Sequence, residues 1–152
     1  MATIDARFGH VNVTSHDWRR LAAFYTDVFG CVVVPPERDI RGADLDAATH
    51  LHDAHLTGAH LRLPGHGDTG PTLEIFQYDA IDAHPSAQVD RPGWGHVAFQ
   101  VPDIPAAIEA VVAGGGASYG DVVSMQTRDG RTVTWVYMTD PDGNLVELQA
   151  WS

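Results

Sequence analysis

The stretch GHVAF at residues 95–99 decides the fold, because GHVNV at residues 9–13 repeats its pattern 86 positions earlier, 95 minus 9. A repeat at a fixed offset is the signature of a duplicated structural unit. Residues 16–29 and 103–113, which follow the two stretches, carry apolar side chains at the spacing of an amphipathic helix. We therefore expect two copies of one module, each of which opens with a strand and a helix.

Short alternating or β-branched runs follow each expected helix and complete the module. Gly30 and the glycines at 114–116 are placed to end the helices, and Asp103 is expected to be the N-cap of the second helix. The turn-forming sequence DPDGN at 140–144 favours a hairpin between the last two runs. Both halves therefore predict the order β-α-β-β-β and an α+β fold, with the later strands at 31–35, 56–63, 72–78, 121–125, 132–139 and 145–151.

The length of 152 residues suits one ordinary domain made of two small modules. We place module one at about residues 5–79, a proline-containing linker at about 80–92 and module two at about 93–152. Residues 37–55 show little periodicity and are expected to form a long loop, and long loops in compact domains are often functional.

The composition excludes several classes of partner. Nine Lys plus Arg against twenty Asp plus Glu give a net charge of −11, which argues against a general nucleic-acid or anionic-membrane surface. No apolar run approaches the roughly 20 residues that a membrane span needs. The one cysteine, Cys31, has no partner for an internal disulfide. We therefore expect a cytoplasmic protein with a small-molecule substrate and no nucleic-acid or membrane partner.

Strand alternation places four ligand-competent residues on equivalent faces of the two modules. In each of the four strands, apolar side chains pack toward the helix and a polar residue lies on the opposite face. Singly, a histidine or glutamate in a strand is more often structural than a ligand. Together they are persuasive, because the repeat predicts an equivalent residue in the other module for each histidine and each glutamate, and the sequence has that residue at the predicted position. The four residues are His10, Glu74, His96 and Glu147.

Two carboxylates that face one cavity repel each other and are costly to desolvate unless a cation neutralises them. We therefore expect these four residues to hold one divalent metal ion. Two imidazoles and two carboxylates suit Zn, Ni, Co, Mn or Fe and exclude a thiolate site.

The same alternation predicts the surroundings of the metal ion. Phe8, Phe76 and Trp94 are expected to form an apolar wall that excludes water. Asn12 and Gln149 are expected to orient the oxygen atoms of a substrate.

Several motifs together resemble the vicinal oxygen chelate superfamily. They are the paired modules, the two Gly-His-Val starts, TLEIF at 72–76 and DPDGNLVEL at 140–148. The resemblance covers nearly the whole chain and implies a curved mixed sheet around a metal-binding cup, together with a homodimer. The superfamily includes glyoxalase I, methylmalonyl-CoA epimerase, extradiol dioxygenases, and fosfomycin and bleomycin resistance proteins, so membership alone does not fix the reaction.

The predicted ligand set is similar to that of bacterial glyoxalase I, whereas epimerases usually carry Gln where Glu74 stands. The resemblance thus implies a metal-dependent lyase or isomerase that moves a proton alpha to a metal-chelated carbonyl. It also implies that Glu74 or Glu147 leaves the metal to act as the base, with either assignment open. Two alternatives remain: a non-catalytic ligand-binding or resistance protein, and a non-haem Fe(II) extradiol-type dioxygenase. No basic cluster is ready for the carboxylates of glutathione, so the substrate stays open.

Overall fold

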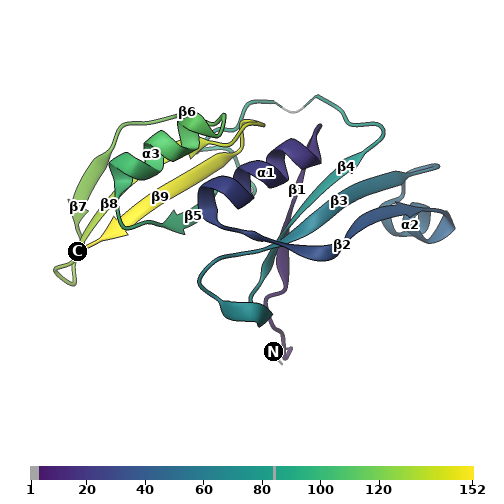
Figure 1. Ribbon diagram of the computed structural model, residues 1–152, viewed down its shortest axis with the longest axis horizontal. Helices are drawn as coiled ribbons and strands as arrows, with labels where there is room; N and C mark the ends of the chain where they lie inside the picture. Colours follow the sequence, from purple (N-terminus) through teal and green to yellow (C-terminus); the bar gives the residue numbers. More distant parts are fainter. Residues whose placement is uncertain (1–3, 84) are drawn as a thin grey trace. The chain divides into compact units, whose positions relative to one another are not determined.

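The computed structural model describes residues 4–83 and 85–152, and their contacts form two compact units. The first unit ends at Ile81 and the second begins at Asp82, except that Asp27–Phe29, at the end of the first helix, groups with the second unit. Each unit contains one of the two expected modules (Figure 1). Of the linker predicted at about 80–92, His84 lies outside the described residues, and the others form no helix or strand.

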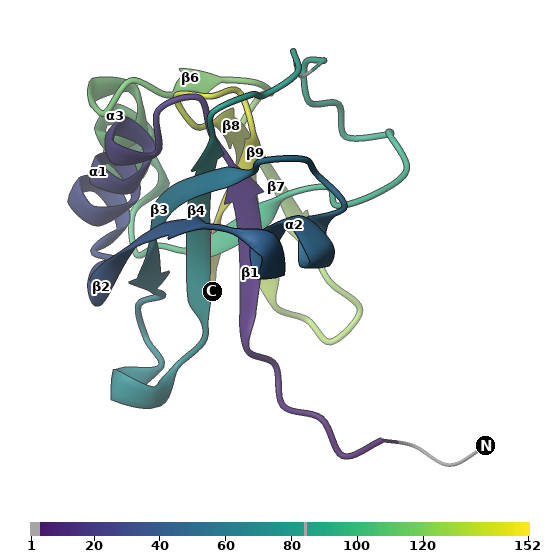
Figure 2. The same ribbon diagram turned by 90° about the vertical axis from the view of Figure 1, so that its right-hand side faces the viewer.

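The first unit is built on a four-stranded mixed sheet. The strands lie in the order β1-β4-β3-β2, with β1 parallel to β4 and the other pairs antiparallel. Figure 2 shows β1 and β4 side by side. In chain order the elements are β1 (His10–Thr14), α1 (Trp18–Phe29), β2 (Val32–Arg41), α2 (Ala43–Thr49), β3 (His55–Arg62), the short 3-10 helix η1 (Gly67–Thr69) and β4 (Thr72–Tyr78).

The second unit repeats this topology. Its strands lie in the order β5-β9-β8-β6, and β7 also pairs with β8. The first and last strands, β5 and β9, are again parallel, and the other pairs are antiparallel. The elements are β5 (Val97–Gln100), α3 (Ile104–Ala113), β6 (Ala117–Ser118), β7 (Val123–Gln126), β8 (Thr132–Thr139) and β9 (Leu145–Trp151). The predicted α+β class with two sheet modules is confirmed.

Local sequence explains where the two long helices begin. The carboxylate of Asp17 accepts a hydrogen bond from the backbone N–H of Arg20, and that of Asp103 accepts one from Ala106. These bonds satisfy donors that the first turn of a helix leaves unpaired. Gly30 ends α1 with a φ of 69°, a left-handed conformation that glycine adopts without steric cost. The predicted N-cap at Asp103 is therefore confirmed.

Alternation along the strands divides each sheet into two faces. In the first unit Leu61, Leu73 and Ile75 are buried, and Gln77 on the same side of β4 accepts a hydrogen bond from the backbone N–H of Trp18. The face of β4 that carries Leu73 is therefore the one toward α1, and Glu74 points away from it. The second unit buries the corresponding residues of its sheet together with its helix: Ile104, Val111, Val136, Met138, Val146 and Leu148.

The prediction of a long loop over residues 37–55 was wrong. Strand β2 continues to Arg41 and pairs with the start of β3, with Arg38 opposite Gly58 and Arg41 opposite His55. The register shifts between Val34 and Arg38, where two prolines lack the N–H that a ladder needs. Helix α2 then fills residues 43–49 without burying any residue, so it leaves no apolar periodicity in the sequence.

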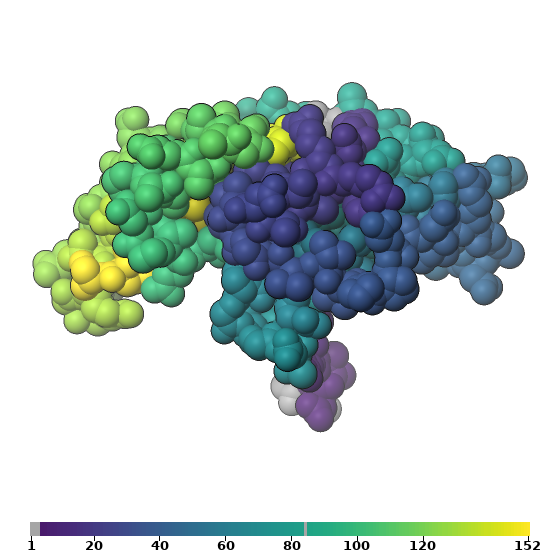
Figure 3. Space-filling model, viewed as in Figure 1, coloured from purple at the N-terminus to yellow at the C-terminus, as the bar shows by residue number. Residues whose placement is uncertain are grey.

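The segment before β1 is hydrogen-bonded to the loop before β4. The guanidinium of Arg7 donates a hydrogen bond of 2.7 Å to the carbonyl of Thr69, so the two segments lie together at the surface of the first unit (Figure 3). None of the helices in the described part of the chain is long and apolar enough to cross a membrane.

Candidate metal centre

The first unit brings His10 and Glu74 together. The Nε2 atom of His10 lies 3.3 Å from Oε2 of Glu74, and the amide nitrogen of Asn12 lies 3.5 Å from the same oxygen. The parallel pairing of β1 with β4 sets this contact, because Asn12 lies opposite Glu74 and His10 lies opposite Thr72. The Glu74 side chain is only 11% exposed, whereas the imidazole of His10 is half exposed. A largely desolvated carboxylate thus meets an accessible imidazole.

The second unit forms the same pair from equivalent positions. The Nε2 atom of His96 lies 3.0 Å from Oε2 of Glu147, whose side chain is 16% exposed. Ala98 lies opposite Glu147 in the parallel pairing, as Asn12 lies opposite Glu74. His96 itself precedes β5, which begins at Val97, so the strand starts later than the sequence pattern indicated. Each unit therefore brings one predicted histidine and one predicted glutamate together. Their convergence on one metal ion stays a prediction.

One residue beside each pair was missed in the sequence. His60 in β3 lies opposite Glu74, and its Nε2 atom is 3.0 Å from Oε1 of that carboxylate. Tyr137 in β8 lies opposite Glu147, and its ring centroid is 5.2 Å from that of His96. The two residues occupy equivalent places because each glutamate sits in the last strand of its module and pairs with the strand before it. Only the register of the antiparallel pairs could have identified them.

The electrostatic environments of these two neighbours favour their neutral forms. Burial lowers the pKa of His60, an effect that outweighs the opposing influence of the Glu74 charge. Burial also raises the pKa of Tyr137, and the charge and hydrogen bond of Glu147 act in the same direction. These shifts therefore favour a neutral imidazole beside Glu74 and a neutral phenol beside Glu147.

The residues predicted to form the apolar wall, and Gln149, which was predicted to orient the substrate, occupy different settings. Phe76 in β4 and Gln149 in β9 are each two residues beyond a glutamate and share its strand face. Phe8 and Trp94 each lie two residues before a histidine, outside the strands, and Trp94 is 97% exposed. Their proposed roles around a substrate stay predictions.

The donor set fits a borderline divalent cation. Each unit supplies one imidazole nitrogen and one carboxylate, both of which bind Zn, Mn, Fe, Co or Ni. Burial raises the pKa of Cys31 to about 11, so this thiol stays protonated and is a poor ligand. Among residues 4–83 and 85–152, no group of three or more His, Cys, Asp or Glu side chains is arranged to hold a metal ion.

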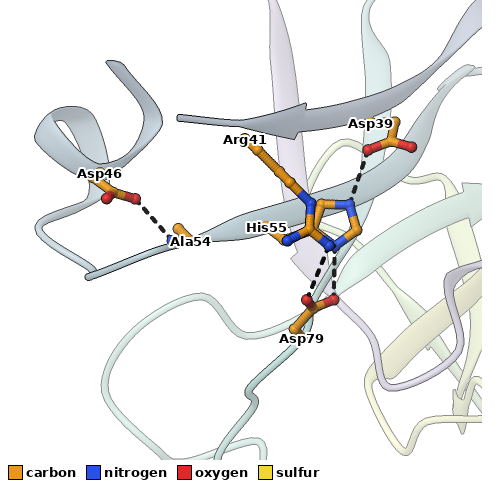
Figure 4. Close-up of polar contacts among 6 residues, drawn as sticks. All are labelled: Asp39, Arg41, Asp46, Ala54, His55 and Asp79. Carbon is orange, nitrogen blue, oxygen red and sulfur yellow. Dashed lines mark hydrogen bonds and ion pairs between the residues drawn. The ribbon is translucent and has the colours of Figure 1, made fainter. Parts of the chain in front are cut away.

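A separate polar cluster lies at the other end of β3 (Figure 4). His55 contacts Asp39 through Nε2 at 2.9 Å and Asp79 through Nδ1 at 2.8 Å. Both hydrogen bonds raise the pKa of His55, and the bond to Asp39 has the larger effect. Nearby, Asp46 of α2 accepts a hydrogen bond from the backbone N–H of Ala54. The cluster links β2, β3 and the end of β4, and none of its members belongs to the predicted metal set.

A sequence profile of the Glyoxalase/Bleomycin resistance protein/Dioxygenase superfamily matches residues 7–148. The chain belongs to this superfamily. The resemblance predicted from the two modules and their motifs is thereby confirmed, and it extends over nearly the whole chain. Superfamily members include enzymes and resistance proteins, so the match by itself does not identify the reaction or the ligand of this chain.

Solved structures of the superfamily share the fold at low sequence identity. A glyoxalase family protein from Bacillus cereus is 20% identical with a TM-score of 0.81, and the match covers 99% of this chain and 98% of the other. One from Enterococcus faecalis is 23% identical with a TM-score of 0.62, covering 94% and 96%.

The fosfomycin resistance protein FosX from Listeria monocytogenes, solved with Mn(II) and sulfate, is 15% identical with a TM-score of 0.56, covering 97% and 93%. At these identities the likeness shows the fold alone. Among curated proteins, none matches the chain by sequence comparison.

Proposed function

We propose that the protein is a metal-dependent lyase or isomerase of the glyoxalase type, which moves a proton alpha to a metal-chelated carbonyl. The observation that carries this proposal is the duplicated pair, in which His10 meets Glu74 and His96 meets Glu147 in equivalent places of the two units. Two pairs supply four donors, and the second carboxylate favours proton transfer over oxygen chemistry. We also propose that the protein is a cytoplasmic homodimer.

In this proposal the four residues would hold one divalent ion, and that ion would supply Lewis acidity to the carbonyl of the substrate. The protein then has to move the proton, and a carboxylate is the group in each pair that can accept it. Glu74 and Glu147 are both mostly buried, which lowers the competition from water for that proton. Either one can serve as the base, and the other completes the metal site.

Other residues on the same faces have supporting roles in the proposal. Phe76 lies next to Glu74 on its strand face, and Phe8 and Trp94 precede the two histidines. Their rings would exclude water from a bound substrate. The amides of Asn12 and Gln149 would orient its oxygen atoms.

The first test is the metal content of the purified protein, with His10→Ala and Glu147→Ala as variants from different units. We expect one divalent ion per site in the wild-type protein and a marked loss in both variants. Stoichiometric metal that persists in both variants would contradict the shared site. The variant His66→Ala is a suitable control, because His66 is an exposed residue just before η1 and lies outside the strands that carry the two pairs.

The second test is solvent exchange of a substrate α-proton in the presence of metal, followed by NMR in deuterated water. Hemithioacetals of glutathione and acyl-thioesters are the first substrates to compare. Exchange that depends on both glutamates is expected for the lyase or isomerase. A non-catalytic binding protein would instead bind a drug-like ligand without metal and tolerate Glu74→Ala and Glu147→Ala. A dioxygenase would consume oxygen with a catechol after loading with Fe(II).

A further inference from the structure

The side chain of His60 is placed among candidate ligands, on the face of the first sheet opposite α1. Its imidazole is 19% exposed, and Nε2 lies 3.0 Å from Oε1 of Glu74. Its other nitrogen, Nδ1, lies 3.4 Å from the hydroxyl oxygen of Thr72. Ring contacts to His10 at 6.1 Å and Phe76 at 5.8 Å complete its surroundings.

We propose that His60 is a positioning residue that holds the Glu74 carboxylate in the orientation needed to bind the metal. This inference rests on the proposed metal site and adds a residue to it. In this arrangement the Thr72 hydroxyl donates to Nδ1 of His60, which leaves the proton on Nε2. The Nε2–H group then donates to Oε1 of Glu74, while Oε2 remains on the side of His10. One oxygen of the carboxylate is thus fixed and the other is presented to the metal.

The alternative is that His60 only fills space in the sheet. The register argues against it, because the packed core lies on the other face, where its neighbours Ala59 and Leu61 are fully buried. The contacts of His60 go to the predicted ligands and to residues beside them. Partners that hydrogen-bond to a metal-binding carboxylate fix its orientation, and their removal typically weakens metal binding by about 10–100-fold.

The second unit supplies an internal comparison. Tyr137 stands opposite Glu147 as His60 stands opposite Glu74, and it also forms a hydrogen bond to its glutamate. A phenol O–H and an imidazole N–H are different groups with the same capacity to donate to a carboxylate. The protein itself therefore indicates which substitution should preserve the function of His60.

The experiment compares His60→Phe with His60→Tyr, two variants that differ by one hydroxyl group. Both keep an aromatic ring next to Phe76, and only His60→Tyr retains a proton donor. The measurement is the affinity for Mn(II), determined by titration followed by electron paramagnetic resonance. We expect His60→Phe to bind Mn(II) about 10–100-fold more weakly than the wild-type protein and His60→Tyr to stay close to it. His66→Ala should match the wild-type protein.

Three results would overturn the proposal, and each has a different meaning. Equal and unchanged affinity in both variants shows that His60 does not act on Glu74. Equal loss in both, with folding confirmed by circular dichroism, shows that the ring shape matters and the proton donor does not. A wild-type protein that binds no divalent metal overturns the proposed function itself, and the role of His60 with it.

Discussion

The two modules share a framework and differ on the faces that carry their glutamates. In both modules the first strand is parallel to the last, and a histidine contacts the glutamate of the last strand. In each case this histidine lies two residues before the residue that pairs with the glutamate. Beside the glutamate, the first module has His60 where the second has Tyr137. Two residues further along β4 and β9, Phe76 lies opposite Gly58, whereas Gln149 lies opposite Trp135.

The two strands nearest each glutamate keep the same pairing in both modules, whereas the side chains beside the glutamate differ. The aromatic ring changes strand between the modules: it comes from the last strand in the first module and from the strand before it in the second. In the first module the Phe76 ring fits only because residue 58 is a glycine without a side chain. A Cβ atom at position 58 would lie 2.7 Å from Cδ1 of Phe76. The His–Glu pairs are repeated, and their surroundings are specific to each module.

The largest effect on stability is expected from Gly58→Ala. This variant tests whether the first module requires a glycine opposite Phe76. The added Cβ would collide with the backbone carbonyl of Ile75 and with the Phe76 ring. We expect the free energy of unfolding to fall by about 1–3 kcal/mol, as for other overpacked sites. Urea unfolding measures this change. Gly120→Ala in the second module is the control, because a Cβ there meets no atom within 4 Å. Equal stability of the two variants would remove the steric argument.

A smaller and equal effect is expected in both modules from loss of the helix caps. Asp17→Ala and Asp103→Ala each remove the hydrogen bond to the first turn, at 3.1 Å and 2.9 Å respectively. Each should lower the free energy of unfolding by about 1 kcal/mol. The matched Asp→Asn variants keep an acceptor and should lose only a part of that. A much larger loss in one module would show that its cap also supports tertiary contacts.

The smallest effect is expected in the pH dependence of stability, where the modules should differ in direction. The contacts of His55 with Asp39 and Asp79 raise its pKa in the folded first module. The group therefore stabilises the fold fully below its unfolded pKa, about 6.5, and this contribution is lost as the pH rises through the folded value. His55→Gln should flatten that part of the curve, which urea unfolding at a series of pH values measures.

In the second module, hydrogen bonds from Thr127 and Arg131 lower the pKa of Asp129 from 3.8 to about 2. Its stabilising contribution is present above the unfolded pKa and is lost as the pH falls toward about 2. The variant Asp129→Asn should remove only this acidic part of the curve and leave the part assigned to His55 unchanged. A loss of both parts in either variant would show that the two clusters are coupled.

The sequence predicted the elements whose signal is local. Strands β4, β8 and β9 have the predicted bounds, because each alternates apolar and polar residues between clear turn signals. Helix α3 begins after Asp103 as expected, because capping depends on residues a few positions apart. The second half of β2 was missed, because its partner is the start of β3, and pairing between strands is not written in either segment alone.

For the site, the sequence by itself determined that a histidine and a glutamate recur at equivalent positions of the two modules, because the repeat offset and the alternation of side chains are both properties of the chain. Only the tertiary structure decided that His10 contacts Glu74, that His96 contacts Glu147, and that His60 and Tyr137 stand beside them. The physical reason is strand register. Residues 14 positions apart, such as His60 and Glu74, become neighbours only when antiparallel pairing fixes which residue lies opposite which.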